Sequence, residues 1–218
     1  MRTYLFDAPA AVELYLPGDR DVKRVVSFIC EQKTRFQEAM LYIPSLCIAE
    51  VFNTLARKYF RPTGDDDRLT DASYGECLRG FREDVHWGRT FYPYEFHRYH
   101  IVAAYRIIPI EHHFALKDEK RHLSTYDILV VAMACELAYT GIREDTRLVT
   151  CDKRMKDVVD KFRAVDLNDL AGKTPLGPLG EVEKGRWVPP ECIDARRIRP
   201  GDLERVEGQD PIHLSSRT

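Results

Sequence analysis

The chain has 218 residues, of which 44% are hydrophobic and 11% aromatic, and its formal net charge is −2. This length fits one compact domain with some excess, and this composition excludes a chain that is disordered throughout. No apolar run approaches the roughly 18 residues of a membrane span, and the near-neutral charge decides neither for nor against a nucleic-acid partner.

Strand and helix patterns alternate through the first sixty residues. In chain order they predict a strand over 3–6 that ends at Asp7, a helix over 10–16 opened by Pro9, an amphipathic helix over 19–36, a strand over 41–43, and a helix that begins at Pro44 and Ser45 and runs through Tyr59. Residues 61–89 interrupt this pattern with Pro62, Gly64 and a run of three aspartates. We interpret residues 61–89 as an insertion with one irregular helix.

The second half of the chain continues the alternation. For the aromatic-rich residues 91–109, two positions for the next strand stay open, 90–92 and 106–108. The pattern then predicts an apolar helix over 124–139, a strand over 147–150, a helix over 152–162 and a last strand over 164–167. Beyond residue 171 the chain is rich in proline and glycine, which predicts an extended arm rather than a second core. The sequence therefore predicts one compact domain over 1–171 and a C-terminal extension over 172–218.

Short strands that alternate with helices predict the α/β class, as a three-layer α/β/α sandwich around a central parallel sheet. In such sheets ligands bind outside the carboxyl ends of the strands. Asp7 directly follows the first strand, Asp152 follows the strand over 147–150 after one residue, and Asp127 lies in the first turn of the apolar helix. We expect these three side chains at the carboxyl edge of the sheet, and Glu50 to reach the same edge through its longer side chain.

Each of these acids also has a purely structural interpretation. Asp127 completes a capping box with Ser124, Asp152 is an N-cap, Asp7 is a turn residue before Pro9, and Glu50 pairs with Arg57 on a solvated helix face. Together, however, four carboxylates on one edge repel one another unless cations bind between them. Hard divalent cations prefer oxygen ligands, and two such ions can activate water for phosphodiester hydrolysis. The set therefore favours a metal site.

Other candidate ligands and binding residues are weaker. His97, His100, His112 and His113 lack helical i, i+4 spacing and a nearby carboxylate motif, so we expect surface or packing roles rather than a site for a softer metal. Residues 74–105 are rich in aromatic side chains, for which core packing or an oligomer interface is favoured over base stacking. The six cysteines form no C-x-x-C pair, which favours a reducing compartment, and the N-terminus has no signal-peptide pattern, so we expect a cytoplasmic protein.

Four segments carry a resemblance to a known family. They are Tyr4-Leu5-Phe6-Asp7, the stretch 48–55 around Glu50, the stretch 123–134 around Asp127, and the stretch 148–155 around Asp152. In this order and spacing the chain resembles PIN-domain nucleases, especially the VapC-like toxins of bacterial toxin–antitoxin pairs. The resemblance covers about residues 1–170 without the insertion.

The resemblance implies a ribonuclease that depends on one or two Mg²⁺ or Mn²⁺ ions, held by Asp7, Glu50, Asp127 and Asp152. It also implies supporting roles for Thr150, which precedes the last acid, and for Asn53, which follows the glutamate. Glu50, Asn53 and Arg57 share one helix face, and Arg57, Lys153 and Arg154 are candidates for contacts to RNA phosphates. Toxins of this kind usually form homodimers and are held inactive by an antitoxin protein.

Three features depart from the family pattern. Ala8-Pro9 stands where the family usually has a hydroxyl residue after the first acid, and both the insertion and the C-terminal extension lengthen the chain. These departures motivate an alternative, a catalytically weak PIN scaffold that binds RNA or a protein partner. A phosphotransfer domain is a third alternative, but the chain has no D-x-D-x-T around Asp7, no Walker loop and no G-x-G-x-x-G.

Overall fold

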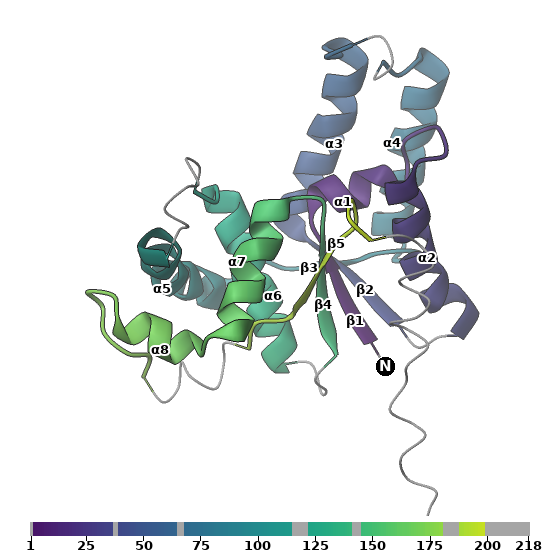
Figure 1. Ribbon diagram of the computed structural model, residues 1–218. Coiled ribbons are helices and arrows are strands. Elements are labelled where there is room, and N and C mark those ends of the chain that lie inside the picture. The colour runs from purple at the N-terminus through teal and green to yellow at the C-terminus, as the bar shows by residue number, and fades with distance from the viewer. Residues whose placement is uncertain are drawn as a thin grey trace, which may run out of the picture.

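The computed structural model describes residues 2–36, 39–64, 68–114, 122–140, 145–180 and 188–198, and of residues 32–36 and 114 only the backbone (Figure 1). Its centre is a sheet in which every pair of neighbouring strands is parallel. The strand order is β3-β2-β1-β4-β5. The strands are β1 (Arg2–Phe6), β2 (Ala39–Pro44), β3 (Tyr92–Tyr94), β4 (Thr146–Thr150) and β5 (Glu191–Asp194). The expected α/β class with a central parallel sheet is therefore confirmed.

The helices of the described residues form two groups by their mutual contacts. The first group comprises α1 (Ala8–Glu13), α2 (Asp21–Phe36), α3 (Ser45–Phe60) and α4 (Asp71–His86). The second comprises α5 (Arg98–Phe114), α6 (Thr125–Thr140), α7 (Lys153–Ala164) and α8 (Leu167–Gly172). Both groups also contact the sheet, an arrangement compatible with three layers (Figure 1).

Helix α6 shows how the sequence dictates this packing. It is apolar around most of its circumference, and its residues Val130–Cys135 are all buried. A helix that is hydrophobic on all sides needs partners on all sides. Accordingly, α6 contacts α5, α7 and β4.

Strand order places a switch in topology between β1 and β4. From β1 the chain moves outward to β2 and then β3, and it returns across the sheet to place β4 on the other side of β1. Because parallel crossovers are almost always right-handed, the helices before and after this return cover opposite faces of the sheet. The carboxyl ends of β1 and β4 thus flank the crevice where ligands bind in sheets of this kind.

The structure corrects one predicted strand and settles an open alternative. The strand expected over 164–167 is wrong, because Ala164 ends α7 and Asp166 accepts the N–H of Asn168 as the N-cap of α8. The fifth strand, β5, comes instead from the C-terminal extension, of which residues 181–187 and 199–218 lie outside the described residues. Of the two positions considered for the third strand, 90–92 overlaps β3 only at Tyr92, because β3 begins there, and 106–108 lies inside α5.

The insertion contains one helix, as predicted, but it is regular rather than irregular. Helix α4 has 16 residues and is N-capped by Thr70, whose hydroxyl accepts the N–H of Ser73. It packs beside α3, where the rings of Phe52 and Phe81 meet with centroids 5.0 Å apart. In Figure 1 the two helices stand together at the end of the molecule where the strands finish.

The described residues also bear on the cysteines and on the possibility of a membrane span. All six cysteines are free thiols. Within the described ranges, none of the helices has the combination of length and apolar character that crossing a membrane requires.

Strand β5 makes a prediction about the C-terminal extension. Ile193 is buried in β5, so Ile193→Ala should lower the free energy of unfolding by about 2–5 kcal/mol through lost burial and a residual cavity. Val188, which is half exposed and precedes the strand, is the matched control, and Val188→Ala should change stability by about 0.5 kcal/mol or less. Urea unfolding measures both. Equal effects of the two substitutions would contradict the docking of β5 on the core.

Candidate metal centre

Asp7 lies at the centre of the switch point. Its backbone N–H donates to the carbonyl of Val149 in β4 at 3.0 Å, which fixes the residue between the ends of the two strands. Its Oδ1 accepts the N–H of Ala10 at 2.7 Å, so the side chain is the N-cap of α1. Its Oδ2 accepts a short hydrogen bond from the hydroxyl of Thr150. Asp7 is only 2% exposed, so this carboxylate is withdrawn from bulk water.

Asp152 is tied to Asp7 through Thr150. The backbone N–H of Asp152 donates to the Thr150 hydroxyl oxygen at 2.8 Å, while that hydroxyl donates to Asp7. Asp152 is also the N-cap of α7, because its Oδ1 accepts the N–H of Arg154 at 2.8 Å. One hydroxyl group therefore connects the ends of β1 and β4.

Asp127 reaches the site from the first turn of α6. Its Oδ2 accepts the N–H of Ser124 at 2.9 Å, and the Ser124 hydroxyl accepts the N–H of Asp127 at 3.2 Å. This is the capping box expected from the sequence. The structural interpretations of Asp7, Asp127 and Asp152 are therefore all confirmed in part, since each caps a helix.

Glu50 lies in the second turn of α3, on its solvent-facing side. Cys47, Val51 and Leu55 form the buried face of this helix, while Glu50, Asn53 and Arg57 are exposed. The polar strip predicted on this helix is therefore present. Asn53 lies on the strip one turn from Glu50, and the Arg57 guanidinium donates to the Thr54 hydroxyl at 3.3 Å.

Three of the acids, Asp7, Glu50 and Asp127, lie close enough for their charges to interact. Burial raises the pKa of Asp7 to about 7, the bonds from Thr150 and Ala10 lower it in part, and the negative charges of Glu50 and Asp127 raise it further. Partial desolvation also raises the pKa of Glu50, with the Asp127 charge adding to the effect and Arg57 opposing it. These carboxylates destabilise one another when they are ionised.

The negative charges of the same acids also act on the buried thiol of Cys47. Its pKa is raised chiefly by burial, and the charges of Asp7, Glu50 and Asp127 add to the rise. A single thiol on α3 thus experiences one acid from the end of β1, one from its own helix and one from α6.

The four acids lie at one edge of the sheet, but their ligand atoms do not lie together as a coordination shell. Among the described residues, two groups of three or more metal-binding side chains have ligand atoms within 4.8 Å of one another, and the acidic quartet is not one of them. Mg²⁺ retains several of its waters in proteins and takes only one or two carboxylates directly, so looser spacing still suits it.

The donor atoms available fit a hard cation. An ionised carboxylate has about four lone-pair sites on its two oxygens, and the capping bonds occupy only part of that capacity. Asp7, Asp127 and Asp152 each engage one or two such sites in the hydrogen bonds described above. The oxygen-only character of the set matches the ligands that Mg²⁺ and Mn²⁺ prefer.

The cationic candidates lie near the same edge. Lys153 and Arg154 are the first two residues of α7, directly after Asp152. Lys153 is exposed, with its ammonium 3.9 Å from the Asp157 carboxylate, and the Arg154 guanidinium donates to the backbone carbonyl of His122. Arg154 therefore also joins the start of α7 to the residues that lead into α6.

Asp194 is an acid of this edge that the sequence analysis missed. It ends β5, pairs in register with Thr150 and is only 2% exposed. The signal was present, because Cys192-Ile193-Asp194 repeats the pattern of Leu5-Phe6-Asp7, two apolar residues followed by Asp at a strand end. Its Oδ1 accepts the N–H of Arg196 at 3.0 Å and its Oδ2 lies 3.6 Å from Arg197, so it closes the turn after β5.

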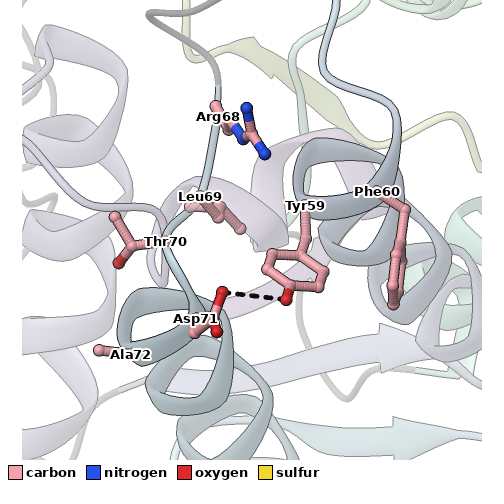
Figure 2. A pocket seen from close by; sticks show the side chains of 7 residues that line it. All are labelled: Tyr59, Phe60, Arg68, Leu69, Thr70, Asp71 and Ala72. Atoms are coloured by element: carbon pink, nitrogen blue, oxygen red, sulfur yellow. Dashed lines mark hydrogen bonds between the residues drawn. The ribbon is translucent and has the colours of Figure 1, made fainter.

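A separate hollow of about 830 Å³ lies between the end of α3 and the start of α4. Its lining, shown in Figure 2, comprises Tyr59, Phe60, Arg68, Leu69, Thr70, Asp71 and Ala72. The Tyr59 hydroxyl donates to Asp71 at 3.0 Å, and the Tyr59 ring stacks on that of Tyr74. Nine residues of helix separate Tyr59 from Glu50, or roughly 13 Å, so this hollow is distinct from the acidic site.

The sequence predicted surface or packing roles for the histidines and did not reveal that some of them lie close to carboxylates in the fold. The structure gathers His97, His100 and Glu136 in one group, and Glu111, His112 and His122 in another. Both groups join side chains of α5 to side chains in α6 or just before it. Spacing along one helix cannot reveal such groups, because they depend on how two helices pack.

No model of a known protein family matches the chain, and no curated protein matches it either.

The buried Asp7 carboxyl predicts an unusual dependence of stability on pH in the metal-free protein. Unfolded Asp7 ionises near 3.8, whereas folded Asp7 stays protonated up to about 7, so folding is increasingly penalised as pH rises through that window. Asp7→Asn keeps a good N-cap and removes this penalty. Relative to the wild type, the variant should therefore gain stability between about pH 5 and about pH 8, by no more than about 3 kcal/mol.

Chemical denaturation in the presence of EDTA, at the two pH values, measures this gain. The double comparison cancels every other group that titrates in both proteins. If Asp7→Asn differs from the wild type by the same amount at both pH values, the carboxyl of Asp7 is not desolvated as described.

Proposed function

We propose that this protein is a metal-dependent endoribonuclease with a PIN-like three-layer α/β/α sandwich, in which Asp7, Glu50, Asp127 and Asp152 hold one or two Mg²⁺ or Mn²⁺ ions. The observation that carries the proposal is the buried Asp7 carboxylate at the switch point, in the field of Glu50 and Asp127. A bound divalent cation would offset the negative charge of this field.

Capping alone does not account for the choice of Asp at position 7. Asn and Ser cap helices about as well as Asp, and neither incurs the free-energy cost of a buried charge. Asp7 carries that cost, as its raised pKa shows. A cation-binding role supplies the missing reason for a carboxylate at this position.

In this proposal the role of each residue follows from its position in the site. The four acids hold the cation and orient the attacking water, and Thr150 fixes the Asp7 carboxylate through its hydroxyl. Asn53 would orient groups beside Glu50, and Arg57, Lys153 and Arg154 would hold RNA phosphates that flank the cleaved bond. A bound Mg²⁺ or Mn²⁺ would lower the pKa of a coordinated water and neutralise charge on the leaving oxygen.

The biological setting belongs to the same proposal. The resemblance to VapC-like toxins supports a cytoplasmic protein, an RNA substrate, a homodimer and an inhibitory antitoxin partner. The exposed apolar side chains of α5 are consistent with a protein contact, since Ile101, Val102 and Tyr105 are each at least half exposed.

A specific observation also supports the alternative of a catalytically weak scaffold that binds RNA or a protein. Asp7, Asp127 and Asp152 each have a capping role that needs no metal, and Ala8-Pro9 follows Asp7. Under this alternative the acids are retained for helix capping, and the positive side chains beside them still bind RNA.

Cleavage of labelled single-stranded RNA tests the proposal. Asp152→Asn should reduce the cleavage rate at least roughly 100-fold, because losing even an outer partner of a metal site costs about 10–100-fold. Asp166→Asn is the matched control, since Asp166 caps α8 with the same bond that Asp152 makes in α7, the i+2 N–H to Oδ1 at 2.8 Å. Asp166 lies by the start of β4, at the opposite edge of the sheet. This control should therefore retain activity.

Parallel reactions with Mg²⁺, with Mn²⁺ and with EDTA complete the test. Cleavage that persists in EDTA, or equally in Asp152→Asn, would refute the metal-nuclease proposal. Binding of RNA without cleavage under all three conditions would establish the scaffold alternative.

A further inference from the structure

We propose that Glu111, His112 and His122 form a second metal site, selective for a late first-row transition metal such as Zn²⁺ and separate from the acidic quartet. One ligand atom from each residue lies within 4.8 Å of the others. The site connects the last turn of α5 with the residues that lead into α6. It does not depend on the proposed nuclease activity.

Glu111 is the anchor of the site. Its side chain is only 3% exposed, and its Oε1 accepts the backbone N–H of Leu123 at 3.1 Å. That bond orients the carboxylate and leaves Oε2 to face the histidines. Oε2 lies 3.1 Å from Nδ1 of His122 and 3.9 Å from Nε2 of His112. A ligand oriented by an outer hydrogen bond is a regular feature of protein metal sites.

The two imidazoles complete the donor set. Their rings stack with centroids 4.0 Å apart and an interplanar angle of 13°, although ten residues separate them in sequence. Both side chains are about half exposed, so an ion can enter from solvent and keep water on its remaining positions. Two histidines and one glutamate form a known zinc ligand set, and imidazole nitrogen favours Zn²⁺ over Mg²⁺.

The other histidine cluster, formed by His97, His100 and Glu136, is less suited to bind a metal. There His100 is fully buried, and its Nδ1 accepts the backbone N–H of His97 at 3.1 Å. A neutral imidazole with an acceptor at Nδ1 carries its proton on Nε2, and Nε2 is the atom that faces Glu136. A nitrogen that carries a proton cannot ligate a metal, so the hydrogen bond from His97 to Nδ1 of His100 disfavours metal binding by this cluster. In the second cluster the short contact joins Nδ1 of His122 to the Glu111 carboxylate, and a metal that binds there displaces the proton between them.

Isothermal titration of the metal-free full-length chain with Zn²⁺, in excess Mg²⁺, tests the site. We expect one Zn²⁺ per chain in the wild type. His112→Ala and His122→Ala should each weaken binding at least about 10–100-fold, since a direct ligand matters at least as much as an outer partner. His113→Ala, which removes the exposed neighbouring histidine of the same helical turn, should leave the affinity unchanged.

Two further measurements distinguish this site from the acidic site and from coordination by cysteine thiolates. Asp7→Asn should bind Zn²⁺ as the wild type does, so failure of the nuclease proposal and failure of this site give different results. The absorption spectrum of the wild type loaded with Co²⁺ should show nitrogen and oxygen coordination without thiolate-to-metal charge transfer. Absence of stoichiometric Zn²⁺ binding, equal binding in both histidine variants and the wild type, or a thiolate signature would each overturn the proposal.

Discussion

The hydroxyl of Thr150 makes the interaction on which the geometry of the candidate metal centre depends. It donates to the buried Asp7 carboxylate and accepts the N–H of Asp152, so it links the ends of β1 and β4 at the switch point of the sheet. Because Asp7 begins α1 and Asp152 begins α7, the same hydroxyl also sets where one helix from each group starts. A parallel sheet brings strand ends together, and Thr150 converts that proximity into a fixed arrangement of acidic side chains.

The acids at this edge combine two roles that are usually considered separately. Asp7, Asp127 and Asp152 satisfy backbone N–H groups at helix starts, and the negative charges of Glu50 and Asp127 act on Asp7. Capping fixes the direction of each carboxylate, which is a requirement of any preorganised metal site. Burial then separates the members of the set: Asp7 is desolvated and has a pKa near 7, whereas Glu50 is exposed on the polar strip of α3. Helix capping alone does not explain why the buried residue, Asp7, carries an ionisable carboxyl group.

The sequence predicted what depends on local pattern. The apolar runs before Asp7 and Asp152 identified β1 and β4, and the Ser124–Asp127 spacing identified the start of α6. It failed where long-range packing decides. The apolar residues near 164–167 suggested a strand, but Asp166 caps a helix there, and the fifth strand came from the segment that was predicted only as an extended arm. Asp194 was missed for the same reason. The histidine clusters were missed because they join α5 to α6 side chains or residues before α6, a relation that no spacing within one helix encodes.

The central claim is that the acidic edge of the sheet binds a divalent cation through Asp7. Direct titration of the metal-free protein with Mn²⁺, followed by electron paramagnetic resonance of the free ion at about pH 8, where Asp7 is ionised, tests it without reference to any substrate. The wild type should bind one or two Mn²⁺ ions, and Asp7→Asn should lose this binding while keeping its fold. Mn²⁺ binding of equal strength and stoichiometry in both proteins, or none in the wild type, would contradict the account.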